Sequence, residues 1–321
     1  MQTDLFVSNS SHSLKLMQKY ISLYHINSST LILHGSIAKN QELIDTDLWR
    51  NIHIIEYNSN HMVVIYKIIK IIKNINLNKL YLSHMENIYE RIIASYVQKK
   101  YTLFDEGITT IEYNIKGLDF LFNNVYSNSL LKKIYLNILC ILFNVSFINQ
   151  SKMISLIDKF ITSFDNIKFN KVLTEKITIY QSCINKEILY KEIYFIGQPY
   201  YLQNSKISEN EYYHIILKIQ EYYKSNGFKF IYFKHPREKE INTQIQQRSI
   251  SINFEEFILN SIKTPEIISS FTSTAFINLH SVKHTNKFEY WKVNNFLDKE
   301  DEIIYEYFDL LNIKGHIINE K

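Results

Sequence analysis

Apolar runs of strand length alternate with runs of helical spacing along almost the whole chain. Short strands are predicted at residues 5–7, 30–33, 52–55, 80–82 and 102–104, with helical patterns between most of them. A second alternating set begins near Ile177, with strands predicted at 194–196, 230–233, 250–252 and 267–268. Such alternation is typical of a parallel sheet wrapped by helices, because parallel strands need a crossover connection. The sequence therefore predicts an α/β fold with two sheets.

The two predicted sheets are separated by a segment with only helical patterns, from about residue 117 to 165. A chain of 321 residues exceeds the length at which one hydrophobic core usually stops growing, ~250 to 300 residues. We therefore predict two domains, residues 1–165 and 166–321. The most apolar helical pattern, residues 134–148, contains Asn137 and Asn144 and is shorter than the ~20 residues that span a bilayer, so we predict a buried or interdomain helix.

The composition of the chain bears on its binding partners and its cellular compartment. The net charge of +4 is small, and the lysines are scattered among acidic residues, so nucleic-acid binding is not indicated. Attraction to an anionic ligand or membrane surface stays open. Cys140 and Cys183 lie far apart in apolar surroundings, which indicates a reduced protein without a disulfide framework or a zinc site. The amino terminus shows no signal-peptide pattern, so a cytoplasmic location is predicted.

A predicted strand at Phe230–Phe233 runs into His235, Pro236 and Arg237. Pro236 lacks the N–H that would continue a strand ladder, so the strand ends there. In open α/β sheets the carboxyl ends of the strands face the ligand crevice, which predicts His235 at an exposed edge. An imidazole there can protonate or hydrogen-bond a departing phosphate, with the charge of Arg237 nearby. A core histidine and a solvated loop arginine are the alternatives.

Two carboxylates and a glycine, Asp105, Glu106 and Gly107, follow the predicted strand 102–104. Adjacent side chains of a strand point to opposite faces, so one carboxylate can face the crevice. A carboxylate there can act as a general base toward a hydroxyl, and partial burial raises its pKa toward the working range. A helix N-cap or a solvated turn is the alternative. Asp105 is our first choice for the base because the strand still holds it, with Glu106 second.

A run of small polar residues, Ser269 to Thr274, ends the predicted strand 267–268 and precedes an apolar helical pattern at 275–279. Hydroxyls and unpaired N–H groups at the amino end of a helix favour an anion. The anion-binding residues predicted here are Ser269, Ser270, Ser273 and Thr274. Ordinary N-capping by Thr272 or Ser273 is the alternative.

Other motifs that carry chemistry are absent from the sequence. It has no Gly-x-Gly-x-x-Gly, no phosphate loop, no Gly-x-Ser-x-Gly and no His-Glu-x-x-His. Asp45 and Asp47 have the spacing of a metal motif but lie among polar residues between elements, so we predict a loop or a helix cap and no metal site. Caps and turns are also the simplest explanation of the other polar residues near predicted strand ends, although an acceptor could lie there: Ser10, Ser11, His12, His34 and Gly35.

The order of these motifs resembles a known family. Asp105-Glu106-Gly107, then His235-Pro236, then Ser269-Ser270 are similar to the motifs of bacterial sialyltransferases of glycosyltransferase family 52, the lipooligosaccharide and capsule type, and polysialyltransferases share a similar signature. The strand end Gly197-Gln198-Pro199 adds to the resemblance, which covers the chain to about residue 280. The resemblance implies a GT-B fold, in which two Rossmann-like domains face a central cleft. It also implies an acceptor side in the first domain and nucleotide-sugar donor binding in the second.

The resemblance implies inverting transfer of sialic acid from CMP-sialic acid to a sugar hydroxyl of a bacterial surface glycan, without a metal or a cofactor other than the donor substrate. A carboxylate would deprotonate the acceptor, and His235 would assist the departing CMP phosphate. The lipooligosaccharide enzymes place a base just after the Gly-x-Pro strand end, where this sequence has no acid before Glu209 and Glu211. Glu211 is more simply a capping-box residue, so Glu209 is a rival base. The residues predicted to bind substrate are Gly107, Gly197, Pro236, Arg237, Ser269, Ser270, Ser273 and Thr274.

Two alternatives stay open. The chain could transfer a sugar from another nucleotide sugar, because the motifs describe a departing phosphate better than they describe the sugar. It could also be a noncatalytic component that binds a glycan or a nucleotide during surface-polysaccharide assembly. The predicted partners are a nucleotide-sugar donor and a glycan acceptor, with peripheral contact to the inner membrane open.

Overall fold

The chain divides into two units, Met1–Ile179 and Tyr180–Lys321. The computed structural model describes residues 2–39, 41–56, 61–83, 87–118, 150–180, 186–202, 207–238, 244–282, 286–293 and 299–318, with the single positions 85, 134, 138, 141 and 142. The boundary falls after the predicted residue 165, because β7 (Leu173–Lys176) still pairs with β6 (Ile157–Thr162) of the first sheet. Apart from four positions, the apolar helix predicted at 134–148 lies outside the described residues, as do Cys140 and Cys183.

The first unit contains a parallel sheet of seven strands in the order β3-β2-β1-β4-β5-β6-β7. Its remaining strands are β1 (Thr3–Ser8), β2 (Ser29–His34), β3 (Asn51–Ile55), β4 (Leu77–Leu82) and β5 (Tyr101–Phe104). The order reverses between β1 and β4, which is the topological switch point of a Rossmann-like sheet. Ligands bind outside the carboxyl ends of the strands at such a point.

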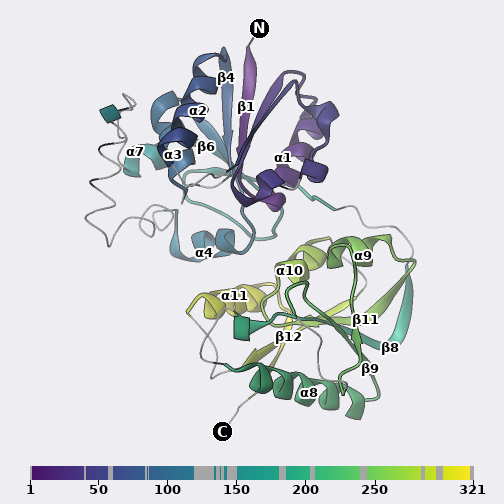
Figure 1. Ribbon diagram of the computed structural model, residues 1–321. Helices are drawn as coiled ribbons and strands as arrows, with labels where there is room; N and C mark the ends of the chain where they lie inside the picture. The colour runs from purple at the N-terminus through teal and green to yellow at the C-terminus, as the bar shows by residue number, and fades with distance from the viewer. Residues whose placement is uncertain are drawn as a thin grey trace. The chain divides into compact units, whose positions relative to one another are not determined.

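Helices cover both faces of this sheet. Figure 1 shows α1 on one side and α2 and α3 on the other. The long helices are α1 (Ser11–Tyr24), α2 (His61–Lys73), α3 (Ile88–Val97) and α4 (Ile108–Lys116). Strands covered on both faces read as continuous apolar runs, and every residue of β1 and β2 is buried. The Phe6 and Tyr81 rings stack with centroids 4.1 Å apart in this core.

The second unit repeats the same topology with six parallel strands in the order β10-β9-β8-β11-β12-β13. The strands are β8 (Glu187–Ile196), β9 (Lys229–Phe233), β10 (Gln247–Arg248), β11 (Lys263–Ser270), β12 (Lys287–Val293) and β13 (Lys314–Ile318). The order reverses here between β8 and β11. The second switch point therefore lies where β8 leads into residues 197–200 and β11 leads into residues 271–274.

The helices of the second unit also cover both faces of its sheet, with α8 on one side and α9, α10 and α11 on the other (Figure 1). They are α8 (Glu209–Ser225), α9 (Phe254–Asn260), α10 (Thr274–Ser281) and α11 (Lys299–Leu310). The predicted capping box is present at the start of α8, where Ser208 and Glu211 bond each other's backbone N–H. The predicted pair of α/β domains is confirmed.

Several predicted elements differ from the structure. The end of the segment 117–165, for which only helical patterns were predicted, contains a short helix, α7 (Gln150–Ser155), and then the strand β6, because an apolar run between helices does not distinguish a buried strand from a helix. The strand predicted at 250–252 is not a strand, and β10 lies before it. Pro265 lies inside β11, where a register shift against β8 accommodates its missing N–H.

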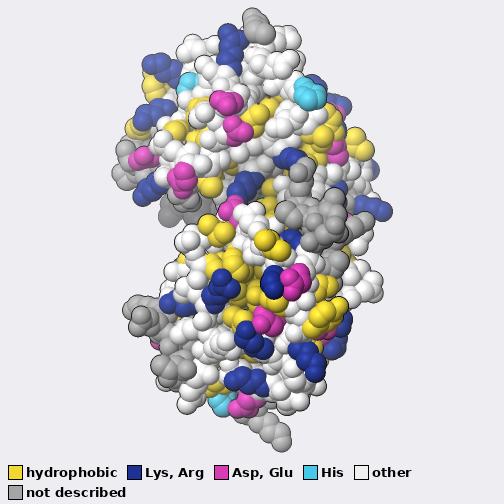
Figure 2. Space-filling model, turned by 90° about the vertical axis from the view of Figure 1, so that its right-hand side faces the viewer, with side chains coloured by type: hydrophobic (Ala, Val, Ile, Leu, Met, Phe, Trp, Pro, Cys, Tyr) yellow, Lys and Arg dark blue, Asp and Glu magenta, His cyan; other side chains and the backbone are white. Residues whose placement is uncertain are grey.

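The surface carries charges of both signs. On the face shown in Figure 2, lysine and arginine side chains are interspersed with aspartate and glutamate. Among the helices in the described part of the chain, none is both long and apolar enough to cross a membrane.

Candidate functional site

Asp105 directly follows β5, and its side chain is completely buried. Oδ2 accepts hydrogen bonds from the Thr162 hydroxyl at 2.7 Å and from the Ser163 backbone N–H at 2.6 Å, while Oδ1 bonds Nε2 of His12. Burial raises the pKa of this carboxyl, but the charge of His12 and the hydrogen bonds outweigh it and hold the pKa below its ordinary value. An ionised, enclosed carboxylate with both oxygens engaged does not meet a substrate hydroxyl, which corrects the direct role predicted for Asp105.

The group that reaches the surface is His12, whose side chain is 14% exposed. Ser10 caps α1 by accepting from the Ser13 N–H, and this places His12 in the first turn, at the carboxyl edge of the sheet. The ring stacks on Phe164 with centroids 5.7 Å apart. A carboxylate that accepts from Nε2–H leaves the imidazole lone pair on Nδ1, the tautomer that a general base needs. From the sequence, a cap or turn was the simplest explanation of His12, with a position that faces an acceptor as the open alternative.

Glu106 and Gly107 shape the turn that follows Asp105. Gly107 has φ +85°, a left-handed conformation that glycine adopts readily, and it caps the amino end of α4. The Glu106 N–H donates to the Thr110 hydroxyl at 3.2 Å, and the Gly107 carbonyl accepts from the Thr110 N–H at 2.9 Å. The structure therefore gives Gly107 a backbone role.

In the second unit His235 lies just beyond β9 and is half-buried, while Pro236 and Arg237 are exposed. Nδ1 of His235 accepts from the Arg237 N–H at 3.1 Å, so the neutral ring carries its proton on Nε2. Burial first, and then the charge of Arg237, lower the pKa of His235 below its ordinary value. The imidazole is therefore a neutral donor at the sheet edge. Glu238, which sequence reasoning missed, is buried beneath it and accepts from the His235 N–H at 2.5 Å.

The predicted anion-binding residues separate into two groups. Ser269 and Ser270 are completely buried, because β11 continues through both of them and helices cover both faces of the sheet. Their hydroxyls contact the Tyr223 hydroxyl at 3.3 Å and the Ile196 carbonyl at 3.2 Å, which corrects their prediction as substrate-binding residues. Ser273 and Thr274 are half-exposed at the start of α10, and the Ser273 side chain makes no capping hydrogen bond there.

Gln198 joins the two sides of the second switch point. Its Oε1 accepts from the Thr272 N–H and its Nε2 donates to the Thr272 hydroxyl, each at 2.9 Å. The neighbouring Gly197 is needed for packing: a Cβ at this position would lie 2.4 Å from the Tyr232 hydroxyl oxygen. Gly197 was predicted to bind substrate, but what the structure shows is a close approach between strands.

The rival carboxylates at the start of α8 have ordinary helix roles. Glu209 is exposed in the first turn, and Glu211 completes the capping box as predicted. Asp45 caps a short 3-10 helix (Thr46–Leu48), as predicted for that segment. Among the described residues, no group of three or more histidine, cysteine, aspartate or glutamate side chains is arranged to hold a metal ion.

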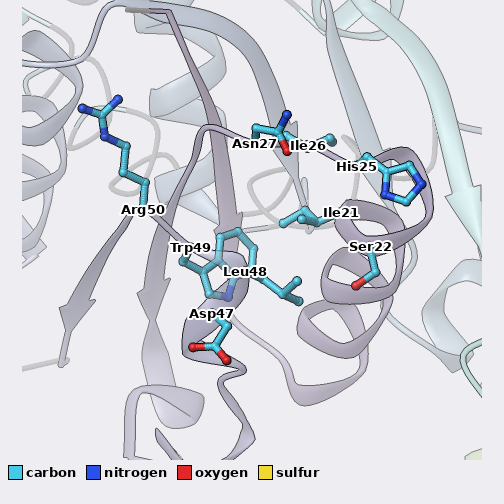
Figure 3. Close-up of a pocket in the computed structure, with 9 residues that line it drawn as sticks. All are labelled: Ile21, Ser22, His25, Ile26, Asn27, Asp47, Leu48, Trp49 and Arg50. Carbon is cyan, nitrogen blue, oxygen red and sulfur yellow. The ribbon is translucent and has the colours of Figure 1, made fainter.

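A pocket of about 380 Å³ lies at the other edge of the first sheet. It is formed by the end of α1 and by the segments that lead into β2 and β3, so it opens at the amino ends of the strands, away from His12. Figure 3 shows Ile21, Leu48 and Trp49 between Arg50 and His25, which stand at opposite sides of the group. The pocket is therefore separate from the candidate site.

No family model and no curated protein sequence matches the chain. Solved structures match it over almost its full length. The glycosyltransferase of kitacinnamycin aligns with a TM-score of 0.59 at 8% identity, over 99% of this chain and 86% of that chain. LpCGTa in complex with UDP has a TM-score of 0.56 at 8% identity, over 100% and 86% of the two chains. A ugt transferase from Siraitia grosvenorii in complex with UDP has a TM-score of 0.56 at 10% identity, over 98% and 86%.

At these identities the likeness concerns the fold. Each unit contains a Rossmann-like parallel sheet, and the alignments cover almost the whole chain, so the chain has the GT-B fold of these glycosyltransferases, as predicted. The activity that the fold serves in this chain has to be argued from its own residues.

Proposed function

We propose that the chain is an inverting glycosyltransferase that moves a sugar from a nucleotide sugar to a hydroxyl group, with His12 as the general base. The observation that carries the proposal is the pair formed by a buried carboxylate, Asp105, and an imidazole at the carboxyl edge of the first sheet. Asp105 accepts a hydrogen bond from Nε2–H of His12. Nδ1 of His12 takes the proton of the acceptor hydroxyl as the hydroxyl oxygen attacks the sugar. The buried carboxylate then stabilises the imidazolium that forms.

In the second unit, His235 and the amino end of α10 act on the donor. The Nε2–H of His235 donates to an oxygen of the departing phosphate, and the first N–H groups of α10 with the hydroxyls of Ser273 and Thr274 bind the same negative charge. Arg237 is exposed and adds positive charge beside the turn. No metal is assigned a role in this proposal.

For the donor we propose CMP-sialic acid, with a bacterial surface glycan as the acceptor. The support is the order of the Asp105-Glu106-Gly107, His235-Pro236 and Ser269-Ser270 motifs. A UDP-sugar is the second candidate, because two of the similar structures are complexes with UDP. Purified protein is incubated with CMP-sialic acid, UDP-hexoses and GDP-hexoses, and nucleotide release with and without glycan acceptor is measured. Release from UDP or GDP donors alone would overturn the sialic acid proposal.

The base is tested by replacing His12 with Ala and Asp105 with Asn. We expect His12→Ala to lower kcat by ~10²- to 10⁴-fold with a smaller change in the donor KM, because the lost group acts on the acceptor proton. Asp105→Asn should also lower kcat by orders of magnitude, because an amide no longer stabilises the imidazolium.

Two variants serve as controls for the base. His25 is exposed at the other end of α1 with φ 51°, which asparagine tolerates, so His25→Asn should keep wild-type turnover. Glu209→Gln should also keep it. A His12→Ala enzyme with normal kcat, or a Glu209→Gln enzyme that loses turnover by orders of magnitude, would show that the base lies elsewhere.

A noncatalytic binding protein is distinguished by His235→Ala. A binding protein would lose only modest nucleotide affinity, whereas the proposed enzyme should lose turnover by ~10²- to 10⁴-fold with donor affinity changed less. His214→Ala on the exposed side of α8 is the matched control.

We also propose that the protein contacts an anionic membrane surface through α2, whose exposed side chains are apolar or basic.

A further inference from the structure

A continuous series of hydrogen bonds links the His235 turn to the strand end before Pro199. Glu238 accepts from the His235 N–H at 2.5 Å with one oxygen and from the Tyr232 hydroxyl at 2.6 Å with the other. The hydroxyl oxygens of Tyr232 and Tyr212 lie 3.0 Å apart, and the Gln198 N–H donates to Tyr212 at 3.0 Å. Since Tyr232 gives its proton to Glu238, Tyr212 must donate to Tyr232. Every bond in the series therefore points toward the carboxylate.

The other end of the series reaches the loop before α10. The Gln198 side chain makes two hydrogen bonds of 2.9 Å with Thr272, which immediately precedes Ser273 and Thr274. The series thus crosses β9, β8 and β11, three neighbouring strands of the sheet. Neighbouring strands are ~4.8 Å apart, so β9 and β11, which lead into His235 and into the loop before α10, lie about 10 Å from each other.

The groups in the series have little freedom to move. Glu238 is 5% exposed, and Tyr232, Tyr212 and Thr272 are almost completely buried. The Tyr232 hydroxyl packs against the Cα of Gly197, where any side chain would displace it. Burying a carboxylate is costly, and the pKa of Glu238 is raised by its burial although the bonds from Tyr232 and His235 oppose the shift. The buried carboxyl therefore lies under the His235 turn with both oxygens engaged, one by the His235 backbone N–H and the other by the Tyr232 hydroxyl.

We propose that Glu238 is a positioning residue, which through Tyr232, Tyr212 and Gln198 sets the spacing between His235 and the amino end of α10. The inference rests on the proposed function, because it assigns these two segments to one phosphate-bearing donor. Glu238 itself is buried and makes no contact with substrate. Its effect on turnover passes through His235.

Kinetics of Glu238→Gln and His235→Ala, alone and combined, test the inference. The amide keeps the size of Glu238 but accepts with only one oxygen, so the turn loosens. We expect Glu238→Gln to lower kcat by about 10- to 100-fold, as misplacements near 1 Å do, with the donor KM changed less. In the His235→Ala background the same change should cost little, since the group it positions is gone. Equal losses in both backgrounds would overturn the proposal.

Tyr232→Phe breaks the series by removing one oxygen, and Tyr223→Phe is its matched control. Both tyrosines are buried, and each donates to a buried carboxylate, Glu238 for Tyr232 and Glu289 for Tyr223. NMR titration of the His235 ring in the free protein is the readout. We expect the pKa of His235 to move toward its ordinary value in Tyr232→Phe, because the loosened turn admits water, and to stay unchanged in Tyr223→Phe.

The kinetics and the NMR titration test the proposed function and the positioning role of Glu238 separately. Wild-type protein that releases no nucleotide from any donor would contradict the proposed function, while the NMR titration would still decide the positioning. A His235 ring that titrates identically in wild type, Tyr232→Phe and Tyr223→Phe would overturn the positioning whether or not the protein is an enzyme.

Discussion

Glu289 of β12 is a buried charge with a purely structural environment, in contrast to Glu238. It accepts from the Tyr223 hydroxyl at 2.8 Å and from Lys314 at 3.1 Å, and it bonds Nε2 of His316 at 2.9 Å. Burial alone would raise its pKa, but these partners outweigh burial and lower the pKa of Glu289 from 4.5 to about 2. The cluster stabilises the ionised carboxylate.

The lowered pKa predicts acid sensitivity of the second unit. A depressed carboxyl pKa contributes stability above the unfolded pKa, and that contribution is lost as the pH falls from 4.5 through about 2. The full contribution is on the order of 3 kcal/mol. Urea unfolding should therefore show Glu289→Gln less stable than wild type at pH 7, with more than half of that difference gone at pH 3. Glu266→Gln, which removes an exposed ion pair with Lys287, is the control and should show little change.

At the residue scale, the sequence located the strand ends and did not show which side chains face out. Asp105 was located at its strand end, but the enclosing groups come from residues 12, 162 and 163, which are distant in sequence. A lone histidine in a first helical turn gives no sign of a partner 93 residues away. Ser269 and Ser270 were expected to lie beyond the strand end, but β11 continues through both of them, and a strand covered on both faces buries both side chains.

At the element scale, α2 has an exposed face without any acidic residue. The helix buries an isoleucine-rich face against the sheet, and the exposed side chains among its described residues are Met62, Val63, Tyr66, Lys67, Lys70 and Lys73. Apolar and basic groups together suit the surface of an anionic bilayer, where each lysine contributes about 1 kcal/mol.

We expect the protein to sediment with vesicles that contain phosphatidylglycerol, and less with pure phosphatidylcholine. Replacing Lys67, Lys70 and Lys73 with Gln should weaken binding by about 10²-fold, and added salt should weaken it in wild type. The same change at three exposed lysines of the second unit is the control: Lys218, Lys224 and Lys263. Equal loss in both triple variants would assign the binding to net charge and not to α2.

Elements were predictable where local pattern and tertiary setting agree. The strands that end at His235 and at Asp105 were found because apolar runs are followed there by Pro or Gly. The region around β6 was not, since its apolar spacing fits a helix equally well and only pairing with β5 decides for a strand. The strand predicted at 267–268 begins later than β11, because a proline interrupts the local strand pattern at position 265, and the register shift that accommodates Pro265 has no local signal.

At the scale of the whole molecule, each unit has its own core and its own tryptophan. Trp49 belongs to the first unit and Trp291 to the second, and both are buried. In Trp49→Phe the remaining tryptophan, Trp291, therefore reports only on unfolding of the second unit. In Trp291→Phe the remaining Trp49 reports only on unfolding of the first.

We expect CMP or UDP to raise the thermal midpoint reported by Trp291 while leaving that of Trp49 unchanged, because the proposed donor groups lie in the second unit. Ligand at a hundred times its Kd stabilises by about 2.7 kcal/mol. A midpoint that rises equally for both tryptophans would place nucleotide binding in both units or couple their unfolding.

The strand order of the first sheet has a consequence for the chain as it leaves the ribosome. β1 is synthesised first but pairs on one side with β4, so its second edge stays open until residue 82 has emerged. The groups that enclose Asp105 emerge later still, since Thr162 and Ser163 follow β6. A nascent chain can thus bury its first strands long before Asp105 has all its hydrogen-bond partners, so the carboxylate that bonds the proposed base, His12, is fully enclosed only when the first unit is nearly complete.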